Sequence, residues 1–177
     1  MSVVRKGKAG LLQMTLAKWN AMSASEAAEA ALPCSGSRAW ARGVAERRPY
    51  GTVEDLAKAA DEVWWGLGEA DWQEAFDSHP RIGQTKAKAA TAESLAWSAG
   101  EQAQVEDAAK AALAEANAEY EARFGRIFIV CATGKTAAEM LGILRERMKN
   151  GNATELREAA EQQRQITQLR IRKWMRA

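Results

Sequence analysis

The sequence contains a single histidine, two cysteines and three prolines among its 177 residues. Cys34 and Cys131 are too few for a small secreted domain held by disulfides, so we expect two buried thiols in a reducing compartment. One histidine, no Cys-x-x-Cys pair and no carboxylates at ligand spacing argue against a catalytic transition metal. The sequence therefore predicts a protein without a metal.

Strong net charge and long apolar runs are also missing. The 25 basic and 23 acidic residues leave a formal charge of +2, which provides no broad field for steering the chain onto nucleic acid or anionic lipid. No apolar run approaches the roughly 20 residues needed to cross a bilayer. The apolar stretch at Leu11 and Leu12 is too short for a secretory signal. We expect a cytoplasmic protein that binds neither nucleic acid nor a membrane.

The length suits one domain with a proper core. Residues 1–14 are basic and contain glycine without sustained periodicity, which predicts a loose N-terminal tail. Residues 15–177 are expected to form a single helical domain. Alanine is abundant there, and polar caps recur in front of apolar residues at helical spacing.

Capping residues and breakers predict where the helices begin and end. Ser23 with Glu26, and Ser98 with Glu101, have the spacing of a capping box. Pro80 disfavours helical geometry at the residue before it. The predicted helices are one from Ser25 to Leu32-Pro33, one with Trp40 and Val44 that ends at 47–51, one after Thr52, a short one opened by Asp71 and Glu74 that ends near Ser78, a long one from Ser98 to Phe124 stopped by Gly125, one from Thr136 to Asn150-Gly151, and a last one from about Thr154.

One segment differs from this helical pattern. Residues 127–132, Ile-Phe-Ile-Val-Cys-Ala, form a continuous β-branched and aromatic run, which is typical of a strand. A sheet needs partner strands, and the sequence offers none. We therefore predict an all-α, single-domain multi-helix bundle with one buried extended segment.

The turn Gly134-Lys135-Thr136 after this run could end a phosphate-binding loop. The first glycine of that pattern would fall on Ile129, and an isoleucine prevents the backbone from wrapping phosphates there. We therefore interpret Thr136 as an ordinary helix cap.

His79 is the first candidate for proton chemistry. Its unperturbed pKa lies in the physiological window, and Pro80 restricts its backbone. The alternative is a packed or solvated residue at a helix end. Glu101 allows two interpretations, as part of a capping box or as a carboxylate that orients His79 and favours its protonated form.

Arg170 stands between Leu169 and Ile171, where a guanidinium near an apolar face would suit a planar polar ligand. The other basic residues at the C-terminal end are expected to be solvated. The seven tryptophans are assigned to helix packing rather than to a cofactor.

Five motifs in order resemble one known family. They are Arg48-Pro49-Tyr50, residues 79–83 (His-Pro-Arg-Ile-Gly), Ser98-x-x-Glu101-Gln102, Phe124-Gly125 with the 127–132 run, and Ile166-x-x-Leu169-Arg170-Ile171. Together they resemble the 2-oxo-4-hydroxy-4-carboxy-5-ureidoimidazoline (OHCU) decarboxylases of urate degradation. The resemblance runs from about residue 16 to residue 171.

This resemblance implies an all-helical, cofactor-free enzyme, usually a homodimer, which converts OHCU to S-allantoin and carbon dioxide. The family's catalytic histidine falls on His79 and its glutamate on Glu101. Positions that contact the ligand fall on Pro80, Ser98, Gln102 and Arg170, and on backbone groups of the segment Ile127, Phe128 and Ile129.

The chemistry agrees with the absence of a cofactor. The carbon that loses carbon dioxide lies beside a ring carbon doubly bonded to nitrogen, so the substrate itself can delocalise the electrons left behind. The protein must orient the carboxylate, stabilise developing charge and deliver one proton to one face. Two alternatives remain, a non-catalytic helical interaction module with a basic last helix and a related lyase or hydrolase for another ureide.

Overall fold

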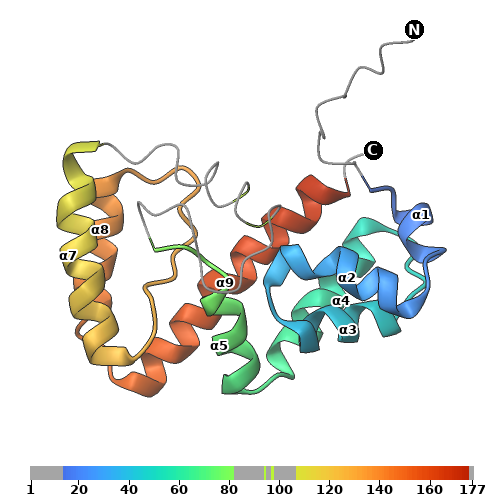
Figure 1. Cartoon of the computed structure of the whole chain (residues 1–177), viewed down its shortest axis with the longest axis horizontal. Coiled ribbons are helices and arrows are strands. Elements are labelled where there is room, and N and C mark those ends of the chain that lie inside the picture. The colour runs from blue at the N-terminus through green and yellow to red at the C-terminus, as the bar shows by residue number, and fades with distance from the viewer. Residues whose placement is uncertain (1–13, 82–93, 95–96, 98–106, 176–177) are drawn as a thin grey trace, which may run out of the picture.

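The computed structural model describes residues 14–81, 94, 97 and 107–175. Within these ranges the secondary structure consists of helices without strands (Figure 1). The helices are α1 (Leu16–Asn20), α2 (Ala24–Ser35), α3 (Arg38–Glu46), α4 (Val53–Trp65), α5 (Glu69–Asp77), α7 (Asp107–Phe124), α8 (Ala137–Arg147) and α9 (Asn152–Trp174). The prediction of an all-α fold is confirmed.

Several helix starts are closed by the predicted caps. Ser23 and Thr52 each accept a bond from the backbone N–H three residues later, and the acidic side chain at that position bonds back to the cap. Thr136 does the same with Glu139 at the start of α8. The Lys135 ammonium donates to the carbonyl of Cys131 at 2.9 Å. The turn at 134–136 is therefore a helix entry, as predicted.

The predicted ends of α2 are wrong. The helix begins at Ala24, after Ser23 as its cap, and continues through Pro33 to Ser35. Pro33 lies in the last turn, where it removes one intrahelical bond, that to the carbonyl of Glu29, and the helix continues for only two more residues. The helix ends at Gly36, whose φ of 85° is left-handed and whose N–H donates to the carbonyl of Leu32.

Three other boundaries also differ from the prediction. The short helix α5 begins at Glu69 after Gly68, which offers no side-chain cap, so no sequence signal marked this start. Helix α8 ends at Arg147, before the predicted stop at Asn150, and α9 begins at Asn152, before Thr154. In contrast, α7 ends at Phe124 with Gly125 at a φ of 70°, as predicted.

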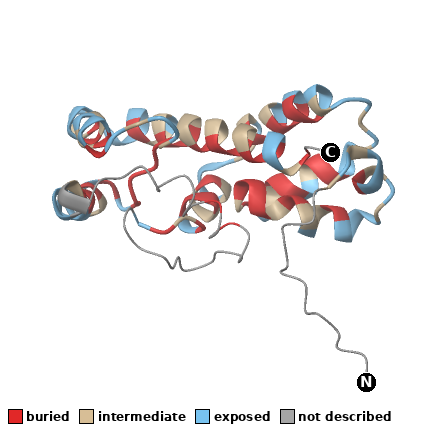
Figure 2. Cartoon of the chain, turned by 90° about the horizontal axis from the view of Figure 1, so that it is seen from above, coloured by how far each residue is buried: buried red, intermediate tan, exposed pale blue. Residues whose placement is uncertain are grey.

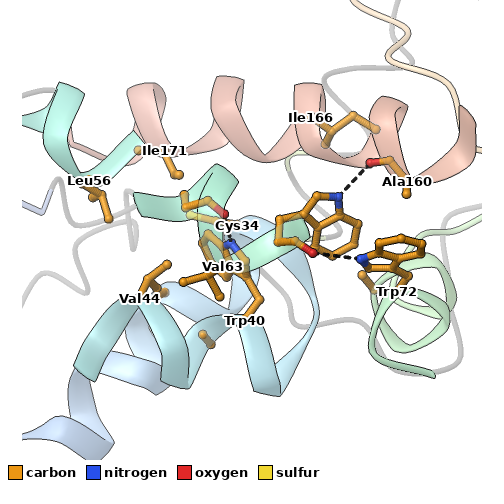
Figure 3. Close-up of a cluster of buried hydrophobic side chains, with 14 of the residues drawn as sticks. Cys34, Trp40, Val44, Leu56, Val63, Trp72, Ala160, Ile166 and Ile171 are labelled. Carbon is orange, nitrogen blue, oxygen red and sulfur yellow. Dashed lines mark hydrogen bonds between the residues drawn. The ribbon is translucent and has the colours of Figure 1, made fainter. Parts of the chain in front are cut away.

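The larger of two hydrophobic clusters joins α2, α3, α4 and α9. Tryptophans anchor it through indole N–H bonds to backbone carbonyls. The indole of Trp40 donates to Ala60 at 3.1 Å, that of Trp64 to Ala160 at 2.9 Å, and that of Trp72 to Trp64 at 3.0 Å. Figure 3 shows the bond that reaches Ala160 and the bond that starts at Trp72 as dashed lines. The tryptophans pack helices, as predicted, and Cys34 and Cys131 are buried thiols outside any disulfide.

The smaller cluster joins α7 and α8, which lie side by side at one end of the molecule (Figure 1). Between the two clusters runs the segment 127–132, which is extended, as predicted, and buried from Ile127 to Cys131. Its side chains alternate: Ile127, Ile129 and Cys131 belong to the larger cluster, Phe128 and Val130 to the smaller. The segment therefore lies between the two clusters and contributes side chains to both.

Helix α9 runs along the molecule from α7 and α8 to α2 and α4 (Figures 1 and 2). Its buried residues recur at helical spacing, and they include Glu155, Gln163, Thr167 and Arg170 among apolar neighbours. None of the described helices is long and apolar enough to span a bilayer. The division at residues 14 and 15 between tail and domain stays a prediction, because residues 1–13 lie outside the described ranges.

Candidate active site

His79 lies where the chain leaves α5. Ser78 closes the helix, the N–H of His79 donates to the carbonyl of Phe76 at 3.1 Å, and Pro80 is buried immediately after it. The predicted helix exit is confirmed. The backbone on both sides of His79 is therefore held by a helix end and a proline.

The end of α2 packs directly against this helix exit. A Cβ atom on Gly36 would lie 2.1 Å from the hydroxyl oxygen of Ser78, so only glycine fits there. The Ser78 hydroxyl donates to the carbonyl of Ala75 at 2.7 Å. These contacts fix the residue next to His79.

The imidazole of His79 contacts α9 through Gln163. His79 Nε2 lies 2.7 Å from Gln163 Oε1, and Gln163 Nε2 donates to Thr167 Oγ1 at 3.2 Å. Gln163 and Thr167 are both buried. The described part of the site therefore provides His79 with a neutral amide partner from α9.

Burial is the main cause that lowers the pKa of His79 from 6.5 to about 3, because a charged imidazole loses its hydration there. The positive charge of Arg170 lowers the pKa further, and the bond to Gln163 acts in the opposite direction. His79 is thus neutral at neutral pH. This direction is opposite to the one expected from a carboxylate neighbour, and the predicted carboxylate, Glu101, lies outside the described residues.

Arg170 is fully buried in α9. Its Nη1 donates to the carbonyl of Pro33 at 3.2 Å and lies 3.5 Å from Ser94 Oγ. The guanidinium carbon is 5.7 Å from the centre of the Trp97 ring, which is a cation–π distance. The prediction that Arg170 lies at the buried face of the last helix is confirmed.

Side chains from three helices hold the extended segment. Asn117 of α7 accepts from the N–H of Phe128 at 3.1 Å, Arg147 of α8 donates to the carbonyl of Ile129 at 2.6 Å, and Gln162 of α9 accepts from the N–H of Cys131 at 2.9 Å. These three backbone groups already have protein partners. A ligand that accepts a hydrogen bond from this segment would therefore use N–H groups other than those of Phe128 and Cys131.

Arg147 itself is held by a buried ion pair. Its Nε donates to Glu155 Oε1 at 2.8 Å, and the hydroxyl of Tyr120 donates to the same oxygen. Both charged side chains are nearly inaccessible to solvent. This cluster joins α7, α8 and α9 behind the extended segment.

Residues 20–172 match the family model of the OHCU decarboxylases. The chain belongs to the OHCU decarboxylase family.

Relatives and solved structures agree with this assignment. The chain is 39% identical to the uric acid degradation bifunctional protein TTL of Arabidopsis thaliana, over 79% of this chain and 44% of that protein. It is 35% identical to the 2-oxo-4-hydroxy-4-carboxy-5-ureidoimidazoline decarboxylase of Amia calva, over 70% of this chain and 73% of that protein. The fold is similar to a crystal structure of an OHCU decarboxylase in the presence of (S)-allantoin, with a TM-score of 0.70 and 36% identity over 81% of this chain and 95% of that one. The chain thus spans less than half of the Arabidopsis relative but most of the Amia one.

Six of the predicted site residues of this OHCU decarboxylase family member lie in the described ranges: His79, Pro80, Ile127, Phe128, Ile129 and Arg170. Ser98, Glu101 and Gln102 lie outside them. Arg170 is close enough to His79 to lower its pKa. Ile127 and Ile129 share the larger cluster with Trp97, whereas the Phe128 side chain belongs to the smaller one.

Gln163 and Thr167 are not among the site residues predicted from the sequence. Gln163 stands in the polar run 161–165, where nothing distinguishes it from the glutamines on either side. One signal was available, because Gln163 precedes Arg170 by seven residues, two helical turns, and so shares its face of the helix. The family's buried arginine could therefore have pointed to it.

A cavity of about 400 Å³ lies beside this site, and Pro33, Gly36, Ser78 and Ser94 are among its lining residues. Pro33 and Ser94 are also partners of Arg170. Across the described residues, no three His, Cys, Asp or Glu side chains gather as ligands of a metal ion would. That the reaction needs neither a metal nor a cofactor stays a prediction.

Proposed function

We propose that this chain decarboxylates OHCU to S-allantoin in urate degradation, without a cofactor, and that His79 is its acid–base residue. The observation that carries the proposal is a half-buried imidazole with a lowered pKa beside a buried guanidinium, His79 and Arg170, in a member of this family. The Amia relative is named for this activity, and the similar crystal structure was obtained in the presence of (S)-allantoin.

A neutral His79 begins the reaction as a proton acceptor. It takes the proton of the substrate hydroxyl while the bond to the carboxylate breaks and carbon dioxide leaves. The electron pair of that bond forms a C=C bond to the neighbouring ring carbon, the C=N electrons move onto the ring nitrogen, and this nitrogen takes a proton from solvent. His79 then returns its own proton to the neighbouring ring carbon as the hydroxyl carbon becomes a carbonyl. Because one imidazole on one side of the ring delivers the proton, the product has a single configuration.

Arg170 supplies positive charge where negative charge develops on the substrate. Inside the protein this charge acts through a low dielectric, so its effect exceeds that of an exposed arginine. We propose that Arg170, with Ser98, Gln102 and backbone groups near Ile127 to Ile129, holds the ring and the ureido group. We also propose that Pro80 contacts the substrate and that Glu101 orients His79 in its protonated form, as the family resemblance implies.

The proposal extends to assembly and location. We propose a homodimer, which the resemblance implies, and a cytoplasmic location, which the sequence predicts. Size-exclusion chromatography with light scattering tests the assembly, and a mass equal to one chain at the concentrations used for assay would contradict it.

Replacing His79 by Asn tests the proposed role directly. General acid–base catalysis contributes roughly 10²- to 10⁴-fold, so the rate of chiral allantoin formation, followed by circular dichroism, should fall by that factor. Lys149→Asn, a substitution at an exposed site on another part of the surface, serves as the control. The role of His79 would be lost if the variant equalled the parent in rate and enantiomeric purity. Assays of other ureides side by side test the substrate.

A further inference from the structure

The contact between His79 and Gln163 specifies which imidazole nitrogen carries the proton. Gln163 presents its amide oxygen to His79 Nε2 at 2.7 Å, and an amide oxygen only accepts hydrogen bonds. His79 Nε2 must therefore donate. In this orientation the amide nitrogen donates to Thr167 Oγ1 one helical turn later, at 3.2 Å.

Burial strengthens this selection. Gln163 is completely buried and Thr167 is 4% exposed, so water competes little with either bond. A neutral imidazole has one proton for its two nitrogens. If Nε2 has that proton, Nδ1 carries the lone pair.

We propose that Gln163, held by Thr167, is a positioning residue that fixes His79 as the tautomer protonated on Nε2 and so leaves Nδ1 to accept the substrate's proton. The assignment of the tautomer is independent of the activity. Only the role of Nδ1 toward the substrate rests on the proposed function.

The proposal restricts how Glu101 acts. A carboxylate needs an N–H donor, and the one N–H of the neutral ring is directed at Gln163. Glu101 can therefore bond to His79 only after Nδ1 has taken a proton. In this scheme Gln163 orients the resting imidazole, and a carboxylate would stabilise the imidazolium formed during the reaction.

Because the chain has one histidine, nitrogen NMR of protein labelled with ¹⁵N in histidine shows a single imidazole. The two nitrogens are told apart by their couplings to the ring hydrogens, since only Nε2 is two bonds from both. We expect a proton-bearing Nε2 and a pyridine-like Nδ1 in the ligand-free protein at neutral pH. A proton on Nδ1, or a charged ring, would overturn the proposal without any variant being made.

Two substitutions then separate positioning from packing. Gln163→Leu keeps the volume but removes the acceptor, so the two nitrogen shifts should move toward each other as both tautomers become populated. Gln163→Glu keeps an acceptor and adds negative charge, so Nε2 should stay protonated and the pKa of His79 should rise. The control is Gln165→Leu on the same helix, whose side chain bonds to Glu161 instead. Wild-type spectra from both Gln163 variants would refute the role of Gln163.

Kinetics test whether Nδ1 of His79 accepts the proton of the substrate. Gln163→Leu should lower kcat roughly tenfold, as loss of a buried hydrogen bond would, with KM nearly unchanged. An unchanged kcat would refute the role of Nδ1. The spectra need no substrate, so a chain that fails to convert OHCU would refute the proposed function and leave the tautomer standing. An active chain with the proton on Nδ1 would refute this inference alone.

Discussion

Gly36 and Ser78 approach each other so closely that no side chain fits between them. The left-handed φ of Gly36 ends α2, and the Ser78 hydroxyl that it faces belongs to the residue before His79. A turn with no chemistry of its own therefore sets the position of the proposed acid–base residue.

Gly36→Ala should destabilise the protein and lower its activity. The left-handed backbone alone costs a non-glycine residue about 1–2 kcal/mol, and displacement of Ser78 adds to this. Urea unfolding measures the first effect and allantoin formation the second. The matched control is Gly142→Ala in α8, where a Cβ meets nothing within 4 Å and helix propensity favours alanine by up to about 1 kcal/mol. Equal stability of the two variants would contradict the argument.

Stability should fall on acidification because of His79. Its pKa is about 3 when folded and about 6.5 when unfolded, so the unfolded chain binds the proton more tightly, and acid favours unfolding below about pH 6.5. The slope is at most about 1.4 kcal/mol per pH unit. Because His79 is partly exposed, solvent screening narrows the pH range over which this slope applies. We expect the wild type to lose more free energy of unfolding than His79→Asn between about pH 7 and about pH 5. If the free energy of unfolding changed with pH equally in the wild type and in His79→Asn, the pKa of His79 in the folded protein would be ordinary.

Arg170→Met should raise the pKa of His79, because a nearby positive charge disfavours the imidazolium. The single histidine signal, followed by NMR during a pH titration, reports this directly. The control is Arg172→Met, two residues later in α9, since Arg172 is exposed and bonds to Gln168. If both variants left the His79 titration where it is in the wild type, Arg170 would not act on the imidazole.

Glu155→Gln should be among the most damaging substitutions outside the site. It leaves the buried guanidinium of Arg147 without its counter-charge, which costs roughly 3–5 kcal/mol. Because Arg147 also holds the carbonyl of Ile129, the extended segment should loosen as well. Glu146→Gln, in an exposed pair with Lys149, should cost less than about 1 kcal/mol. Chemical unfolding of both variants gives the comparison.

Local patterns in the sequence predicted much of the fold. Ser23, Thr52 and Thr136 act through bonds to residues three positions away, so their effect can be read without the tertiary structure. The prediction for Pro33 was wrong because a proline disfavours a helix without always ending it, and α2 continues for two residues beyond it. Gly68 gave no signal because it starts α5 without a side-chain cap.

The site was predicted less completely, because part of it depends on contacts between residues far apart in the sequence. His79 and Arg170 could be singled out by residue type, neighbours and family resemblance. The contact of His79 with Gln163 joins residues 84 positions apart and exists only because α5 packs on α9. The direction of the His79 pKa shift likewise depends on burial, which a sequence pattern does not measure.

Helix α9 carries Glu155, Gln163 and Arg170 on one buried face, at intervals of eight and seven residues. Each residue of an α-helix turns by about 100°, so a single insertion or deletion between Gln163 and Arg170 would bring only one of them to its partner. Substitutions on the exposed face leave this spacing intact. We therefore expect α9 to tolerate substitutions on its exposed face but not insertions or deletions, and changes in chain length to be tolerated only in other segments.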